Sequence, residues 1–244
     1  GRLQALLDSL DGEAVAQRAA VAAVRAGLSL EAPSWLTSVP DPAGIVPAFV
    51  ERCALPRLLN SPEDAAYVAS FARALQALRT PRFPTLLYLD RVMKDVMAAV
   101  VCATDREAGN LGIFLRDTLG MVEAWRSDAG GGVYVAECEG TPGFSSSLAA
   151  PAGGAGSPGA PPGAPPTTPL VHFRKLCHKW QHRVARGCRD ALASGEYVQT
   201  RNALLVLHAA VRVYPGLAGV AVLLRKAAGR VRDEDGREDL RTLA

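Results

Sequence analysis

The chain has 244 residues, which suits one large domain or two small ones and is long enough to bury a core. It is rich in Ala and Leu, only 6% of its residues are aromatic and its net charge is +3, so helices are favoured over sheets. No apolar run approaches the roughly 20 residues of a membrane span, so no membrane partner is predicted. The chain begins without Met and inside a helical pattern, from which we expect a piece of a longer protein.

The first predicted helix runs from the N-terminus to Gly27, which is placed to end it as a C′ residue. Its apolar face opens with four leucines at helical spacing, namely Leu3, Leu6, Leu7 and Leu10. The run EAVAQRAAVAAVRA (13–26) continues this face.

Three capping signals then mark helix starts. Asp41-Pro42 gives an N-cap followed by Pro at the first helical position, which predicts a helix through Phe49, Val50 and Leu55. Pro47 and Pro56 are expected to keep it short. Ser61-Pro62 repeats the signal, and another helix is expected from about residue 85. Thr104 with Glu107 predicts a capping box. The one strand-like segment, VYVAEC at 133–138, has no partner with which to form a sheet.

Residues 145–169 differ from the rest, since they contain 7 Pro, 5 Gly and 6 Ala but no charged side chain. Such a segment cannot bury enough apolar surface to offset its ordering entropy, so a disordered linker is predicted. Helices are expected again over 170–194, 196–213 and 217–231. The charged tail, 233–244, is expected to fray.

The predicted architecture is therefore all-α. Antiparallel helix pairs without a fixed repeat length suggest an irregular helical-repeat (HEAT/ARM-like) α-solenoid, and a compact bundle is the alternative. The predicted divisions are a helical-repeat segment over 1–144, the low-complexity insert over 145–169, a continuation of the helical repeats over 170–232, and the tail over 233–244.

Chemical motifs for catalysis or metal binding are weak. No GxSxG motif or P-loop is present, and Cys177 and Cys188 lie on an apolar stripe where packing is the simpler role. His178 and His182 form an i, i+4 pair on one helical face, but no third metal ligand lies beside them. We predict no enzyme activity, cofactor, metal site or small-molecule substrate.

A basic helix is the strongest functional signal. Residues 171–232 contain 12 basic and 2 acidic side chains. Spacing over HFRKLCHKWQHR (172–183) sends Phe173 and Trp180 inward and the basic side chains outward. Such a face suits phosphates or an acidic protein surface, and the sequence leaves both open. The candidate residues are Arg174, Lys175, His178, Lys179, His182, Arg183, Arg186 and Arg189.

Several ordered blocks resemble the largest (second) subunit of the THO complex over about residues 43–230. They are ERCALPRLLNSPEDAAYVASF (51–71), TPRFPTLLYLDRV (80–92), LGIFLRDTLGMVEAWRSD (111–128), Glu137-Cys138, Pro142-Gly143-Phe144, HFRKLCHKWQHR (172–183), SGEYVQTRNALLVL (194–207) and VYP (213–215).

This resemblance implies a nuclear, non-enzymatic scaffold in co-transcriptional mRNP assembly and mRNA export. The implied partners are other THO subunits, a DEAD-box RNA helicase and export adaptors, with direct contact to mRNA as the alternative function. The family's basic residues correspond to Arg174, Lys175, Lys179, Arg183 and Arg201. We expect Arg201 to pair inside the fold, near Glu196 or Asn202.

Overall fold

The structure, a computed structural model, describes residues 1–145 and 167–244. Every regular element in these two ranges is a helix, which confirms the predicted all-α class for the described residues. Their one extended pairing is an isolated bridge between Ser145 and Thr167. No helix among them combines the length and apolar character needed to cross a membrane.

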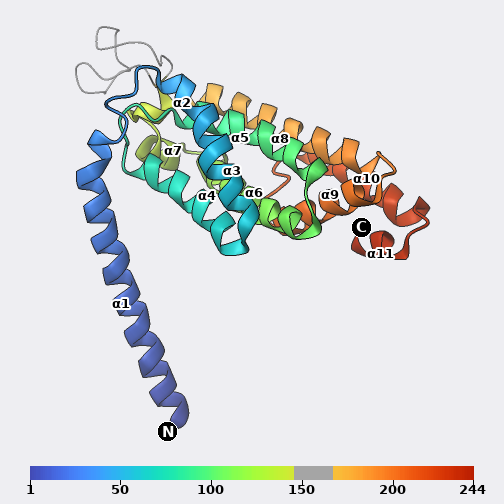
Figure 1. The fold of residues 1–244 in the computed structure, drawn as a ribbon, viewed down its shortest axis with the longest axis horizontal. Coiled ribbons are helices and arrows are strands. Elements are labelled where there is room, and N and C mark those ends of the chain that lie inside the picture. Colours follow the sequence, from blue (N-terminus) through green and yellow to red (C-terminus); the bar gives the residue numbers. More distant parts are fainter. Residues whose placement is uncertain (146–166) are drawn as a thin grey trace.

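Apart from residues 145–169, which separate η3 from α8, the connections between the helices are short, and Figure 1 shows their arrangement. In chain order they are α1 (Arg2–Glu31), η1 (Ala32–Ser34), α2 (Pro42–Phe49), η2 (Val50–Ala54), α3 (Leu55–Asn60), α4 (Pro62–Ala77), α5 (Thr85–Cys102), α6 (Asp105–Ser127), α7 (Gly132–Glu137), η3 (Pro142–Phe144), α8 (Leu170–Leu192), α9 (Tyr197–Ala210), α10 (Ala218–Glu234) and α11 (Glu238–Leu243).

Helix α6 is the centre of the packed body. It packs against α3 and α4, which precede it in the chain, and against α9, which follows it. Helix α5 packs on α8 and α9. The contact between α6 and α9 is close, because a Cβ on Gly112 would lie 2.7 Å from the Cβ of Ala209. Gly187 similarly lets α8 approach the side chain of Met97 on α5. One large hydrophobic core extends from α2 to α10.

Helix α1 leaves this body and has no buried residue along its length (Figure 1). The predicted end at Gly27 is wrong, because the helix continues to Glu31. Nothing lies within 4 Å of the position that a Cβ on Gly27 would occupy, so no neighbouring element requires the chain to turn there. The predicted apolar face exists, but no other part of the described chain covers it.

The capping predictions are confirmed. Asp41 accepts the N–H groups of Ala43 and Gly44, Ser61 accepts the N–H of Asp64, and Thr104 and Glu107 form both bonds of a capping box. The helix expected after Asp41 through Leu55 forms, and it runs through the π-helical η2 into α3, where it ends at Asn60. This widened turn lies just before Pro56, whose missing N–H interrupts the ordinary helical ladder.

The VYVAEC segment is helical rather than extended, since 132–137 form α7. Gly131 enters it with a φ of 71°, and the carboxylate of Asp128 accepts the N–H groups of Gly130 and Val133. Tyr134 is the buried side chain of α7, and its hydroxyl donates to the carbonyl of Thr168 at 2.6 Å.

Most of the predicted linker, 146–166, lies outside the described residues. The described ends of that linker are held against η3 and α7. Thr168 N–H donates to the Phe144 carbonyl at 2.8 Å, and Gly140 N–H donates to the Thr167 hydroxyl at 3.0 Å. The two sides of the insert therefore meet at one place in the body.

The C-terminal tail does not fray as expected. Residues 238–243 form α11, and Leu240 is fully buried in a small cluster with Leu192, Leu204 and Val231. Arg201 does pair inside the fold, but with different partners from those expected. Its guanidinium lies 2.5 Å from Asp105 and 3.4 Å from Asp239, which ties α9 to α6 and α11.

Candidate basic interface on helix α8

Helix α8 is held by a deeply buried apolar stripe. Phe173, Cys177, Trp180, Val184 and Cys188 recur at intervals of three or four residues, and each is at most 1% exposed. This spacing places them on one side of a helix, as predicted from the sequence. The polar residues between them therefore lie at the rim or outside, and the structure separates them into two groups.

The first group is tied to Asp90 on α5. One oxygen of its carboxylate accepts hydrogen bonds from Lys179 Nζ at 3.0 Å, Trp180 Nε1 at 2.9 Å and Arg183 Nη1 at 3.2 Å. Arg183 also donates to the backbone carbonyl of Asp90. Burial opposes ionisation of Asp90, but the hydrogen bonds from Trp180 and Lys179 and the charge of Arg183 outweigh it and lower its pKa. Lys179 and Arg183 thus brace α8 against α5.

Two further candidate residues also have partners inside the chain. Arg174 donates to the carbonyls of Arg126 and Asp128, at 3.2 and 2.9 Å. These carbonyls lie at the C-terminal end of α6, where a cation is favoured by the helix dipole. Arg189 pairs with its neighbour Asp190 at 2.7 Å.

The second group consists of exposed basic residues on α8 that have no hydrogen-bond or ion-pair partner in the described part of the chain. Lys175, His178, His182 and Arg186 are exposed and make no hydrogen bond or ion pair within residues 1–145 and 167–244. They stand at i, i+3, i+7 and i+11, which is one side of the helix. The rings of His178 and His182 face each other with centroids 4.4 Å apart. We call these four residues the free basic stripe.

Helix α10 contributes further exposed basic side chains beside α8, although the candidate residues predicted from the sequence all lie on α8. Arg189 of α8 and Arg230 of α10 line the same hollow between the two helices, together with the acids Glu234 and Asp235. Lys226 precedes Arg230 by one helical turn, and both side chains are exposed. The charge count over 171–232 contained this signal, but only packing shows that α10 lies beside α8.

The cysteines do not form a reactive centre at this site. Burial raises the pKa of Cys177 and of Cys188 to about 12, so both remain thiols near neutral pH. Among the residues that the structure describes, no three His, Cys, Asp or Glu side chains are grouped to hold a metal ion.

Comparisons with known proteins agree with the sequence blocks. A family model described as Tho2, transcription factor/nuclear export subunit protein 2, matches residues 1–244. THO complex subunit 2 of Arabidopsis thaliana is 35% identical over all of this chain, which covers 13% of that protein. The mouse and human proteins of the same name are each 31% identical over all of this chain, which covers 15% of their length.

The chain thus spans about one seventh of the curated relatives it matches, and the similarity to the yeast protein of that name is confined to 78 residues. The full-length match of the family model is nevertheless sufficient for membership. The resemblance seen in the sequence is confirmed, and the chain belongs to the Tho2 family.

Proposed function

We propose that this chain is a non-enzymatic scaffold segment of a THO complex, within the larger transcription–export assembly. In the nucleus it would contribute to co-transcriptional mRNP assembly, mRNA processing and mRNA export. It would contact other THO subunits, a DEAD-box RNA helicase and export adaptors, with its helix pairs stacked as an irregular solenoid. Membership in the Tho2 family and the names of the relatives support this role.

The observation that carries the scaffold role is the uncovered apolar face of α1. Leu3, Leu7 and Leu10 are 79%, 56% and 51% exposed, and Val21 and Val24 continue the same side of the helix. Exposed apolar rows of this extent are typical of surfaces that other proteins cover. Since α1 has no buried residue, its sequence is free to serve a partner rather than the core of this chain.

We expect the double substitution Leu7→Glu/Leu10→Glu to abolish capture of THO subunits co-expressed with the tagged chain. The free energy of unfolding should change by less than about 0.5 kcal/mol, because neither side chain is buried. Ala19→Glu/Ala23→Glu is the matched control, since it adds the same charge to the opposite side of α1. If Leu7→Glu/Leu10→Glu still captured the THO subunits undiminished, α1 would be excluded as the contact.

Direct RNA binding is the second candidate, and the free basic stripe favours it. Its Lys175 and Arg186 carry charges that no acid in the described chain neutralises. Phosphate contacts by such side chains give sequence-independent binding that weakens with salt. Lys179 and Arg183 would contribute less to this binding, because Asp90 already holds them.

Reversing Lys175 and Arg186 to Glu should lower affinity for a single-stranded 20-nucleotide RNA at least about tenfold in fluorescence anisotropy. Loss of two phosphate contacts should also reduce the slope of log affinity against log salt by about 1.4. Lys94→Glu/Arg106→Glu changes two other exposed, unpaired cations by the same charge and should leave affinity nearly unchanged. Equal losses in both variants would mean that net charge, and not the stripe, governs binding.

A further inference from the structure

Helix α1 carries a regular seven-residue repeat along its exposed apolar side. Between Leu3 and Leu28, steps of four and three residues alternate without a break through positions 3, 7, 10, 14, 17, 21, 24 and 28. All of these positions are Leu, Val or Ala except Gln17, which stands near the middle. An apolar repeat sustained over about three to four heptads is typical of a coiled coil. We call these positions the heptad seam.

The heptad seam is uncovered in the folded chain. Leu7 and Leu10 are 56% and 51% exposed, Val24 is 60% exposed, and no residue of α1 is buried. Figure 1 shows the helix projecting from the packed body, with its N-terminus at the end remote from that body. Most helical stability in proteins comes from packing of an apolar face, which α1 lacks within the described chain. A second helix over the seam would supply this packing.

The seam is complementary to itself when a second copy runs in the opposite direction. A two-fold axis between residues 15 and 16 places Leu3 opposite Leu28 of the second copy, and the next two layers pair Leu with Val. At the centre, the long side chain of Gln17 meets the small Ala14. A parallel copy would instead pair Ala14 with Ala14 and Gln17 with Gln17. One layer would then contain a gap and another would confine two amides, so the antiparallel pair packs better.

Charges beside the seam favour the same direction. Asp11 and Arg18 stand one heptad apart on the same edge of the seam. In an antiparallel pair, equivalent edges face each other, so Asp11 lies opposite Arg18 of the second copy, and symmetry repeats this contact. On the other edge, Leu6 lies opposite Gly27, which has no side chain to obstruct it. Such a contact uses the same surface on both chains and closes at two copies.

The shape of the chain also suits an antiparallel pair. Helix α1 has 30 residues, which gives it a length of about 45 Å. Overlap over residues 3–28 places the two packed bodies at opposite ends of the helix pair, where they do not collide (Figure 1). A parallel pair would bring both bodies to the same end, although paired helices lie only about 8 to 10 Å apart.

We propose that α1 binds α1 of a second copy of this chain through the heptad seam, as an antiparallel two-stranded coiled coil. The inference rests on the proposed function, because it names the partner that covers the α1 face. It joins two scaffold segments, and the predicted capture of other THO subunits would then depend on the paired helix.

Sedimentation velocity of the purified 244-residue chain tests the pairing. The wild-type chain should be a dimer at high micromolar concentration. Leu7→Glu/Leu10→Glu should be a folded monomer, because it introduces charges into the seam but removes no buried side chain. Ala19→Glu/Ala23→Glu adds the same charge outside the seam and should remain a dimer. A monomeric wild-type chain, or a dimer that persists in Leu7→Glu/Leu10→Glu, would overturn the proposal.

Charge reversal tests the direction of the second helix. Asp11→Arg should weaken the dimer at least about fivefold, because it places like charges opposite each other at two symmetric contacts. Asp11→Arg/Arg18→Asp should restore the affinity, since the antiparallel pair again opposes unlike charges. In a parallel pair Arg18 lies opposite Glu13 instead, so the Arg18→Asp change would oppose two acids. Failure of the double variant to restore the dimer would contradict the antiparallel arrangement.

The capture experiment separates this inference from the proposed function. A wild-type chain that is monomeric but captures THO subunits through Leu7 and Leu10 would refute the inference and leave the proposed function standing. A dimer that captures no THO subunit would do the reverse. A THO subunit that displaces the second copy, to give one chain per complex, would show that another protein occupies the seam and would also refute the inference.

Discussion

Replacing Gly143 by Ala should destabilise the fold by about 3 kcal/mol, which is the largest effect expected here from a single methyl group. A Cβ at this position would lie 2.1 Å from the Thr85 hydroxyl and 2.7 Å from Oε1 of Gln76. These two atoms are themselves hydrogen-bonded at 2.6 Å, and Gln76 also donates to the Glu137 carbonyl and to Thr141. The added methyl group must therefore break a buried network or displace η3.

Displacement of η3 is costly because Phe144, its last residue, would move with it. Its ring is fully buried between Trp125, Tyr134 and Phe173, with centroids 5.4 to 5.6 Å apart. Urea denaturation followed by circular dichroism measures the loss as a shift in midpoint. Gly109→Ala on α6 is the opposite control, since nothing lies within 4 Å of its Cβ, and it should stabilise by about 0.5 to 1 kcal/mol.

A double-mutant cycle identifies the cause. Thr85→Ala removes the closest oxygen, so it should recover part of the stability lost in Gly143→Ala even though it is destabilising by itself. Strict additivity of the two losses would show that the contact with Thr85 is not responsible. A cost below about 1 kcal/mol for Gly143→Ala would show that η3 moves freely.

Local signals in the sequence were sufficient to predict most helices of the packed body, but not α7, whose VYVAEC segment resembles a strand. The caps at Asp41, Ser61 and Thr104 depend on residues within three positions of one another, so a short stretch determines them. The predictions were wrong where contacts with residues distant in the sequence determine whether a helix ends or forms. Gly27 did not end α1, since no neighbour turns the chain there, and the tail folds because Leu240 finds a cluster formed by α8, α9 and α10.

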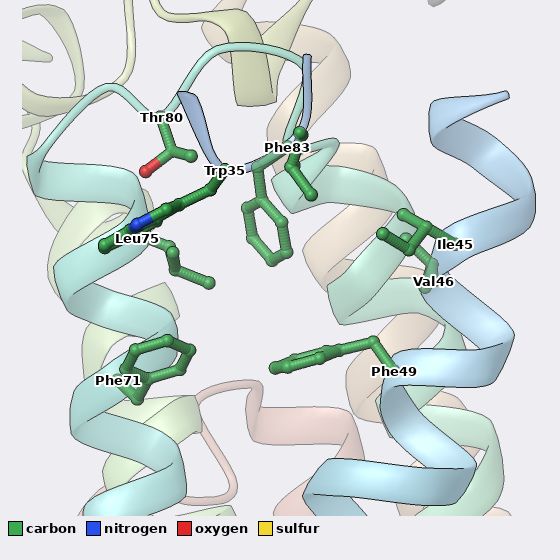
Figure 2. Close-up of a pocket in the computed structure, with 9 residues that line it drawn as sticks. Trp35, Ile45, Val46, Phe49, Phe71, Leu75, Thr80 and Phe83 are labelled. Atoms are coloured by element: carbon green, nitrogen blue, oxygen red, sulfur yellow. The ribbon is translucent and has the colours of Figure 1, made fainter. Parts of the chain in front are cut away.

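The same division applies to the candidate site. Helical spacing alone predicted correctly that Phe173 and Trp180 lie inward and that Lys175 and Arg186 lie outward. It could not show that Lys179 and Arg183 are held by Asp90, because that acid stands about 90 positions earlier in the chain. An apolar pocket lined by Trp35, Phe49 and Phe71 likewise brings together separate segments of the chain, so no local sequence pattern predicts it (Figure 2).

Asp90 is the site of the second large effect. Asp90→Ala should cost about 2 kcal/mol, because it leaves the buried Trp180 N–H and the half-buried Arg183 without their carboxylate. Asp90→Asn should cost less, since its amide oxygen can still accept the Trp180 N–H. Denaturation midpoints of the two variants compared with the wild type measure this difference. Equal costs would mean that charge, and not the indole hydrogen bond, makes Asp90 stabilising.

The pH dependence follows from the lowered pKa of Asp90. A carboxylate whose pKa is lower in the folded state adds stability above its unfolded pKa of about 3.9, and this is lost as the pH falls through the folded value. The wild-type chain should therefore lose stability below about pH 4 more steeply than Asp90→Asn does. Parallel denaturation series between pH 2 and pH 6 decide this, and coincident slopes would contradict it.

Asp90→Asn also tests whether the cations of α8 that Asp90 holds can contribute to RNA binding once they are released. Without the carboxylate, Lys179 and Arg183 have no acid to neutralise them, and they join a surface that already carries Lys175 and Arg186. If RNA binds this face, Asp90→Asn should raise its affinity several-fold and steepen its salt dependence, although it destabilises the fold. Unchanged affinity in a folded Asp90→Asn chain would place the RNA contact away from the α5 side of the helix.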